Sequence, residues 1–173
     1  MSKPLIRPAG PDDLPALVAV QLESWRRTYG DVLPKDYLGA AMEHDLSRLW
    51  SEDRLARDLV LVAEREGEVV GLSGTILETP ETAYLDNLHV ALRVEGQGVG
   101  RALMAGTAGA VLERGRRALH LTVVTTNARA LRFYEALGGA RRDAIEDKMF
   151  GNPVAAYPIW WEGTAFRALA KTG

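Results

Sequence analysis

Three glycines at alternate positions, 96, 98 and 100, stand between a β-prone segment and a helix-prone one. Residues 84–91 are mostly apolar, branched or aromatic and predict a strand. Residues 102–114 are rich in strong helix formers and predict a helix. A glycine loop at such a junction gathers backbone N–H groups and the positive end of a helix dipole, and its missing Cβ atoms allow a ligand to approach closely. The stretch therefore predicts a site for an anion such as a phosphate group.

Two well-known phosphate loops do not fit this glycine pattern. A dinucleotide loop needs G-x-G-x-x-G/A, but its last position is Arg101 when counting starts at Gly96 and Leu103 when it starts at Gly98. A P-loop needs a Gly-Lys-Ser/Thr ending, which this loop lacks. The pattern G-x-G-x-G therefore indicates either a different phosphate loop or a glycine-rich turn that holds no ligand.

The length and composition of the chain exclude several classes of protein. With 173 residues, 47% of them hydrophobic and 25% charged, the sequence fits one globular domain over 1–173. A net charge of −2 gives no electrostatic basis for binding nucleic acid or an anionic membrane. No signal peptide is visible, nor an apolar run of about 20 residues. The absence of cysteine excludes disulfides and fits the reducing cytoplasm, where we expect the protein.

Hydrophobic periodicity and turn residues divide the chain into short strands and helices. We expect strands at 5–8, 58–64, 69–77, 84–91, 118–124, 140–145 and 154–161, with a polar loop over 146–153. We expect helices from about residue 14 to Tyr29–Gly30, and at 33–38, 44–57, 102–114, 127–137 and 163–171. The tight turn at 65–68 makes its two strands antiparallel, whereas the strand–helix–strand order after residue 84 implies a parallel pair. The chain is therefore predicted to be an α/β domain around a mixed sheet.

A second motif lies in the predicted helix 127–137, where Asn127, Ala130, Phe133, Tyr134 and Gly138 follow a fixed spacing. This segment resembles the pattern Asn-x-x-Ala-x-x-Phe-Tyr-x-x-x-Gly of the GCN5-related N-acetyltransferases, the GNAT superfamily. The glycine loop is similar to the acetyl-CoA loop of the same family, Gln/Arg-x-x-Gly-x-Gly/Ala. The resemblance implies an enzyme that moves an acetyl group from acetyl-CoA to a primary amine of a small molecule or peptide.

The resemblance also implies a fold and a cofactor site. The fold is a GNAT-like mixed, largely antiparallel sheet with a parallel central pair, flanked by helices on both faces. In the family the loop amides hold the pyrophosphate of coenzyme A, and the residue matched by Asn127 contacts the pantetheine arm. The residues assigned to acetyl-CoA in this way are Leu88, His89, Val90, Gly96, Gln97, Gly98, Val99, Gly100, Arg101, Asn127 and Tyr134.

Tyr134 is the catalytic residue that the resemblance implies, as a general acid beside the thioester sulfur. The thiolate that leaves when an amine attacks a thioester must take a proton, and a phenol with a pKa of about 10 is a suitable donor. The alternative is that Phe133 and Tyr134 are core aromatics of an amphipathic helix. Because the chain has no cysteine to form an acyl-enzyme, we expect the amine to attack directly.

The loop departs from the family pattern at Glu95, which stands where the family has Gln or Arg. A carboxylate disfavours a nearby pyrophosphate unless it points to solvent, so Arg93 or Arg101 is expected to supply positive charge. The departure leaves open a second reading, a non-catalytic acyl-CoA-binding or regulatory module. The loop is also compatible with a larger acyl-CoA.

The general base is predicted on the central strand. Strand alternation places Tyr84, Asp86, Leu88 and Val90 on one face, and Leu85, Asn87 and His89 on the other. Asp86 would then lie beside apolar side chains that raise its pKa toward neutrality, which makes it the first candidate. His89, Glu23 on the first helix and a water relay are the alternatives.

The acceptor pocket is assigned to the first helix. Residues 24–29, followed by Leu33 and Pro34, resemble the region that helps to form this pocket in many family members, so Trp25 and Tyr29 are the expected substrate-binding residues. The acceptor stays open among an antibiotic, a polyamine, an amino acid and a peptide N-terminus. The oligomeric state stays open and includes a homodimer. Trp160 and Trp161 are expected to pack against the end of the sheet or to form a subunit contact.

The sequence predicts neither a metal site nor a hydrolase nucleophile. His44, His89 and His120 stand far apart and lack the spacing of metal ligands. Residues 71–75 resemble a nucleophile elbow but end in Thr75 instead of glycine. The expected chemistry therefore needs acetyl-CoA and an amine, and no metal.

Overall fold

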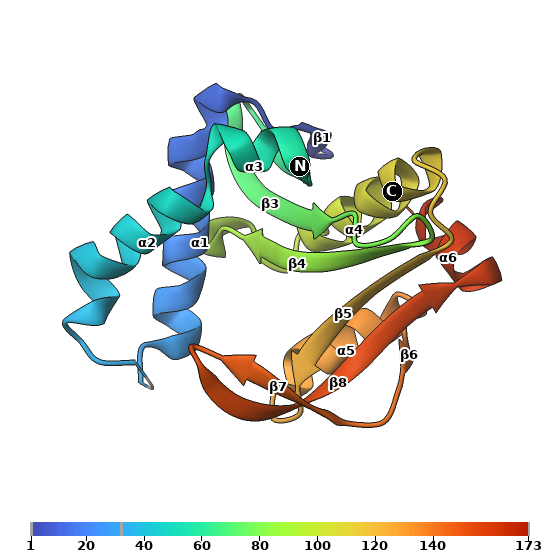
Figure 1. The fold of residues 1–173 in the computed structure, drawn as a ribbon. Helices are drawn as coiled ribbons and strands as arrows, with labels where there is room; N and C mark the ends of the chain where they lie inside the picture. The colour runs from blue at the N-terminus through green and yellow to red at the C-terminus, as the bar shows by residue number, and fades with distance from the viewer. Residues whose placement is uncertain (1, 32, 173) are drawn as a thin grey trace.

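An eight-stranded mixed sheet forms the centre of the computed structural model, which describes residues 2–31 and 33–172 (Figure 1). Met1, Val32 and Gly173 of the expected domain lie outside the described residues. The strands are β1 (Leu5–Pro8), β2 (Leu59–Arg65), β3 (Glu68–Ile76), β4 (Thr82–Val90), β5 (Ala118–Val124), β6 (Ala140–Arg141), β7 (Ile145–Met149) and β8 (Asn152–Glu162). They lie in the order β1-β2-β3-β4-β5-β8-β6, with β7 also paired to β8. The pairs are antiparallel except β4 and β5, which confirms the expected sheet with its parallel central pair.

Helices cover both faces of this sheet, as expected (Figure 1). The helices are α1 (Leu14–Tyr29), α2 (Met42–Leu49), α3 (Glu52–Arg57), α4 (Val99–Glu113), α5 (Ala128–Ala136) and α6 (Gly163–Leu169), with short turns η1 (Pro11–Asp13), η2 (Tyr37–Ala41) and η3 (Leu92–Val94). Helix α1 packs on β3 and β4, whereas α4 packs on β2, β3 and β4 from the other side. None of the helices in the described residues is long and apolar enough to cross a membrane.

Two apolar clusters explain this layering. Alternate residues of β2 divide between them, so that Val60 and Val62 pack with α1 while Leu59 and Leu61 pack with α4. Trp161 belongs to the cluster with α4, where its side chain is fully buried and its indole N–H donates to the carbonyl of Leu137 at 3.0 Å. The sheet is therefore buried on both faces near its centre.

Strands β4 and β5 pair only over their first residues. The parallel ladder joins Thr82–Tyr84 to Ala118–His120, and the two strands then separate, as Figure 1 shows. Beyond this point β5 continues to pair with β8 as far as Val124. The outer half of β4 therefore stays paired with β3 on one edge and has no neighbouring strand on the edge toward β5, and the candidate site lies there.

The predicted helix 44–57 is split in the structure. Helix α2 ends at Leu49, Trp50 takes an extended conformation, and Ser51 caps α3 by accepting a hydrogen bond from the Arg54 N–H at 3.3 Å. The Trp50 indole is buried and donates to Gln21 of α1 at 2.7 Å. Tertiary packing of Trp50 therefore interrupts a segment whose local sequence favours one continuous helix.

The predicted polar loop 146–153 is wrong. These residues form most of β7, the start of β8 and the turn between them at Phe150–Gly151, where both φ angles are positive. The predicted strand 140–145 is reduced to β6, and β7 begins at its last residue. Strand β7 is mostly exposed, so its polar composition reflects its position in the sheet and not an irregular conformation.

Candidate active site

The glycine loop joins β4 to α4, as the sequence predicts. Gly96 and Gly98 have φ angles of 71° and 80°, in the left-handed region that favours glycine. Gly98 is the N-cap of α4, and a Cβ atom there would meet no atom within 4 Å. At Gly100 a Cβ would lie 3.3 Å from the Phe133 ring, because α4 and α5 pack closely. The loop thus leaves open space at the N-terminus of α4, where the first helical N–H groups lack intrahelical partners.

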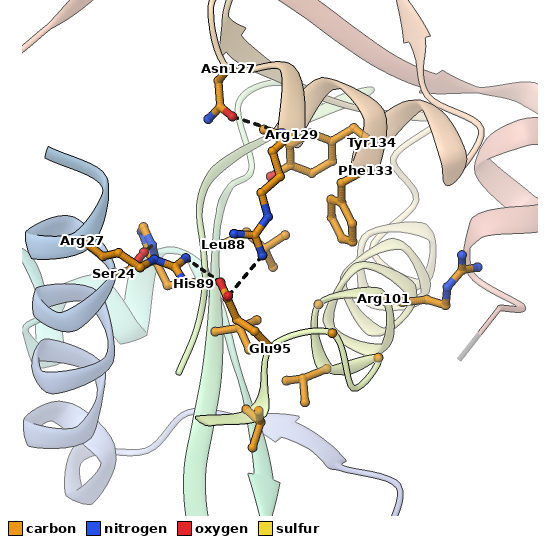
Figure 2. Close-up of a pocket in the computed structure, with 17 residues that line it drawn as sticks. Ser24, Arg27, Leu88, His89, Glu95, Arg101, Asn127, Arg129, Phe133 and Tyr134 are labelled. Atoms are coloured by element: carbon orange, nitrogen blue, oxygen red, sulfur yellow. Dashed lines mark hydrogen bonds and ion pairs between the residues drawn. The ribbon is translucent and has the colours of Figure 1, made fainter. Parts of the chain in front are cut away.

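A cleft of about 460 Å³ lies between α1, β4, the glycine loop, α4 and α5 (Figure 2). Most of the residues assigned to acetyl-CoA from the sequence line it, namely Leu88, His89, Val90, Gly96, Gly98, Val99, Gly100, Arg101, Asn127 and Tyr134. Gln97 does not line the cleft, because its side chain accepts a hydrogen bond from Arg65 at 2.6 Å and donates to the Arg93 carbonyl at 3.2 Å. Apolar walls and an amide-rich end suit a long ligand that carries phosphate.

Tyr134 lines the cleft from α5, whose N-terminus is capped by Asn127 accepting from the Ala130 N–H at 3.1 Å. The Tyr134 ring packs edge-on against Phe133 and Trp161, with ring centroids 5.1 and 5.9 Å away. In the described part of the chain its hydroxyl has no hydrogen-bond partner. Burial raises the pKa of Tyr134 above its usual value, so the phenol keeps its proton.

A second cavity, of about 490 Å³, lies on the α1 side of β4 and β5, and we refer to it as the chamber. Trp25 and Tyr29, the expected acceptor-binding residues, line it together with Phe150. The three rings pack edge to face, with centroids 5.2 to 6.1 Å apart. His89 lines both the chamber and the cleft, so the two cavities adjoin at this residue.

Comparison with known protein families identifies this arrangement. The pattern of the Acetyltransferase (GNAT) family matches residues 18–139, a range that includes the glycine loop and Tyr134. The chain belongs to the GNAT family. An uncharacterized N-acetyltransferase of Archaeoglobus fulgidus is 34% identical over 137 residues, which are 75% of this chain and 88% of that protein. The family match confirms the expected enzyme class, an acetyl-CoA-dependent N-acetyltransferase.

Solved structures confirm the GNAT fold. The PaiA N-acetyltransferase of Thermoplasma acidophilum, solved in complex with coenzyme A, has a TM-score of 0.78 and 20% identity, covering 94% of this chain and 100% of that one. The ribosomal-protein-alanine N-acetyltransferase of Brucella melitensis has a TM-score of 0.70 and 27% identity, covering 91% of this chain and 99% of that one.

In this GNAT chain the predicted faces of β4 are wrong beyond Asp86, because a β-bulge interrupts the strand there. Asn87 pairs with Gly74 and Leu85 with Thr75, so Asp86 is an additional residue without a partner in β3. Leu88 and Val90 line the cleft, whereas Asp86, Asn87 and His89 line the chamber. The bulge therefore moves Asp86 to the same side of the sheet as His89.

Asp86 has polar neighbours instead of the expected apolar ones. Its carboxylate accepts hydrogen bonds at 2.8 Å from the Arg54 guanidinium and at 2.8 Å from the Asn87 amide. Arg54 is buried and also pairs with Asp58 at 3.4 Å. The surroundings that made Asp86 the first candidate for the general base are absent, and its role as a base stays a prediction.

The two alternative base residues are each held by a hydrogen bond. His89 Nδ1 lies 3.0 Å from the Ser24 hydroxyl, and burial lowers the pKa of His89 to about 4, so it is neutral at pH 7 and a weak base. The Glu23 carboxylate accepts from the Leu92 N–H at 2.8 Å and joins α1 to the turn before the glycine loop. Neither arrangement favours removal of a proton from an ammonium group.

Glu95 lines the cleft between two arginines that the sequence analysis does not assign to the site. Its carboxylate pairs with Arg27 from α1 and, at 3.1 Å, with Arg129 from α5 (Figure 2). The hydrogen bond from Arg27 is the main cause that lowers the pKa of Glu95. The Glu95 carboxylate is thus neutralised inside the site.

The sources of positive charge differ from the expected ones. Arg101 lines the cleft, but Arg93 lies at the surface and pairs with Glu68 at 2.8 Å. Arg129 follows the Asn127 cap by two positions, which is a signal that could have found it. Arg27 lies 68 residues from Glu95 in the sequence and gives no such signal. The described residues contain no group of three His, Asp or Glu side chains that could hold a metal ion.

Proposed function

We propose that this protein transfers the acetyl group of acetyl-CoA to a primary amine of a small molecule or peptide, by direct attack, with Tyr134 as general acid. The observation that carries the proposal is that the cleft and the chamber adjoin at His89. The cleft offers amide groups at the start of α4 and the Tyr134 hydroxyl, whereas the chamber offers aromatic rings and carboxylates. Two substrates can therefore reach one point from opposite faces of the sheet.

The residues of the cleft fit acetyl-CoA. The open space at Gly98 and the N-terminus of α4 would hold the pyrophosphate, and Leu88 and Val90 give an apolar wall for the pantetheine arm. Arg27 and Arg129 are further candidates for phosphate contacts, because both guanidiniums already bind the carboxylate of Glu95 in the cleft.

Tyr134 has the properties that a proton donor needs in this reaction. The amine nitrogen forms a bond to the thioester carbon as the carbon–sulfur bond breaks, and the sulfur leaves as a thiolate that takes a proton. Tyr134 remains protonated at neutral pH, and its hydroxyl has no hydrogen-bond partner in residues 2–31 and 33–172. It is therefore available for the departing sulfur.

The chamber supports an amine acceptor with an apolar or aromatic part. Trp25, Tyr29 and Phe150 give it an aromatic wall, and Asp86 and Asp147 give it negative charge. A peptide N-terminus remains among the acceptors, and a relative that is 27% identical is a ribosomal-protein-alanine N-acetyltransferase.

A thiol-release assay tests the proposal. The purified protein is mixed with acetyl-CoA and, separately, with putrescine, phenethylamine, alaninamide and a short peptide with a free N-terminus. Amine-dependent release of coenzyme A, with the acetylated amine seen by mass spectrometry, supports the proposal. Calorimetric binding of acetyl-CoA without release with any amine would favour the non-catalytic acyl-CoA-binding module, and faster release from propionyl-CoA would favour a larger acyl group.

A further inference from the structure

The chamber contains a carboxylate that no cation balances. Asp147 lies on β7, which pairs with the start of β8 in a hairpin that reaches the end of α1 (Figure 1). Its side chain lines the chamber. Its Oδ2 accepts a hydrogen bond from the Thr122 hydroxyl at 2.8 Å, and its Oδ1 accepts from the Lys148 N–H at 2.7 Å. Across residues 2–31 and 33–172 no Lys, Arg or His side chain forms an ion pair with it. Asp86, the other carboxylate of the chamber, is paired with Arg54.

The hydrogen bonds of Thr122 have a fixed direction. Its hydroxyl has one proton, and this proton is donated to Asp147. The second contact of Thr122, with the Tyr84 hydroxyl at 3.1 Å, must therefore be donated by Tyr84. The lone pairs of the Tyr84 oxygen are then available to accept a proton. Tyr84, Thr122 and Asp147 form a directed chain, which we call the hydroxyl relay.

The hydroxyl relay begins at Tyr84, which lies near the proposed acid Tyr134. Tyr84 is the last residue of β4 that pairs with β5, so it stands where the two strands separate. Tyr84 lines the chamber. The pKa of Tyr134 is raised first by burial and second by the electrostatic effect of Tyr84, so the two phenols lie within electrostatic reach of each other. An amine that approaches the thioester from the chamber would thus meet Tyr84 on one side and Tyr134 on the other.

We propose that the hydroxyl relay removes the proton of the acceptor ammonium group and that Asp147 is the general base of the reaction. This inference rests on the proposed function. The ammonium N–H bond breaks as Tyr84 takes that proton, while Tyr84 passes its own proton to Thr122 and Thr122 passes its proton to Asp147. The products are a neutral amine, whose lone pair is free to attack, and a neutral carboxylic acid.

The remaining protons also balance. Tyr134 gives its proton to the departing sulfur and recovers one from the nitrogen that has formed the amide. Asp147 releases its proton to water before the next turnover, so one proton appears per ammonium acetylated. Burial raises the pKa of Tyr84, which therefore works as a neutral hydroxyl throughout.

The other titratable groups of the chamber are less suited to this role. Burial raises the pKa of Tyr29 on α1, so it keeps its proton. On β4, Asp86 is bound to Arg54, and His89 has a pKa of about 4. Lys148 on β7 is exposed, and its ammonium group donates hydrogen bonds and accepts none. The part of β8 that lines the chamber is apolar, with Val154 and Ala156.

Substitutions at the middle of the hydroxyl relay test it most sharply. Thr122→Val removes the hydroxyl at nearly constant shape, whereas Thr122→Ser keeps it. We expect Thr122→Val and Asp147→Asn to lower kcat about 100-fold or more at pH 7, with the KM for acetyl-CoA unchanged, and Thr122→Ser to stay near the parent. The loss should shrink as the pH approaches about 10, because the amine then arrives without its extra proton. Glu146→Gln, at the exposed neighbouring position of β7, is the matched control and should act as the parent.

Three results would overturn the inference while the proposed function stands. These are parent-like kcat in Thr122→Val, an equal loss in Thr122→Ser, or a pH-dependent loss in Asp86→Asn but not in Asp147→Asn. If the parent itself releases no thiol with any amine, the proposed function fails and amine binding becomes the readout. Tryptophan fluorescence with phenethylamine and coenzyme A should then show at least several-fold weaker amine binding in Asp147→Asn, and equal binding would overturn the inference.

Discussion

The carboxylate of Glu95 lies 3.1 Å from the guanidinium of Arg129, so an ion pair joins the glycine loop to the first turn of α5. Arg27 binds the same carboxylate from α1. The family pattern has Gln or Arg at this position, and here the acidic side chain is held between two basic ones. A phosphate group at the loop would compete with Glu95 for both guanidiniums.

Glu95→Gln should therefore tighten acetyl-CoA binding by a few-fold. The substitution removes one negative charge from the cleft and frees Arg27 and Arg129, and a partly exposed ion pair is worth only about 0.2–1 kcal/mol. Titration calorimetry at low and moderate salt measures the change, which should decrease as salt increases. Glu68→Gln is the control, because Glu68 pairs with Arg93 outside the cleft. Weaker binding in Glu95→Gln would mean that Glu95 orients the two arginines for the ligand.

Gly98→Val should abolish acetyl-CoA binding in a protein that still folds. The new side chain would project into the open space at the N-terminus of α4, and the left-handed conformation costs about 1–3 kcal/mol for a branched residue. Gly67→Val is a matched control, since Gly67 has the same φ of 80° and an equally open surrounding in the β2–β3 turn. We expect both variants to lose similar stability by urea unfolding and only Gly98→Val to lose binding by calorimetry. Parent-like affinity in Gly98→Val would contradict the assignment of the loop to the pyrophosphate.

Local signals allowed much of the cofactor side to be predicted from the sequence. The bounds of β5 match the prediction, and the glycine loop, the Asn127 cap and Tyr134 lie along one cleft. Each of these depends on residues close together in the chain, such as glycines that permit positive φ or a side chain that caps its own helix. Short-range patterns of this kind produce the same local structure independently of how distant elements pack.

The chamber, which is the proposed acceptor side, depends on contacts between distant residues, and beyond Trp25 and Tyr29 the sequence does not predict it. The bulge at Asp86 leaves no mark in a period-2 pattern, and it reverses the faces of the residues after it relative to those before it. The hairpin that brings Asp147 to Thr122 was predicted as a loop, because an exposed polar strand resembles a loop in composition. The pairing of Arg27 with Glu95 joins residues 68 positions apart. Such contacts are determined by the packing of complete elements.

His89 should make the stability of the protein depend on pH in the acidic range. Its pKa is about 4 in the folded state, because burial disfavours the charged ring, and about 6.5 when unfolded. Between these values the unfolded state binds more protons, so the free energy of unfolding rises with pH. The contribution of His89 is complete above about pH 6.5 and is lost as the pH falls to about 4, with a maximum of about 3 kcal/mol.

Urea unfolding at pH 7 and pH 4.5 checks this dependence. The loss of stability between the two pH values should be smaller in His89→Gln than in the parent. His44→Gln, which changes an exposed histidine, should lose as much as the parent. Equal losses in all three proteins would show that the folded state accepts a proton at His89 without cost. The comparison uses the difference between two pH values, so a constant destabilisation of His89→Gln does not affect it.

Tyr134→Phe should separate binding from catalysis. The ring that packs against Phe133 and Trp161 remains, and only the hydroxyl in the cleft is lost. We therefore expect acetyl-CoA affinity close to that of the parent by calorimetry and a kcat lower by about 10² to 10⁴ in the thiol-release assay. Tyr157→Phe is the control, because Tyr157 packs beneath Arg141 and lines neither cavity.

The pH dependence of Tyr134→Phe distinguishes the acid from the base. Loss of the proton donor leaves the sulfur to depart as an unprotonated thiolate at every pH, so the rate should stay low even where the amine is already neutral. This differs from the loss of kcat expected for Thr122→Val, which should shrink as the pH approaches the pKa of the amine. Parent-like kcat in Tyr134→Phe, under conditions where the absence of a pre-steady-state burst shows that product release does not limit the rate, would leave Tyr134 as a packing residue. Recovery of its rate at high pH would instead place Tyr134 with Tyr84 on the path of the amine proton.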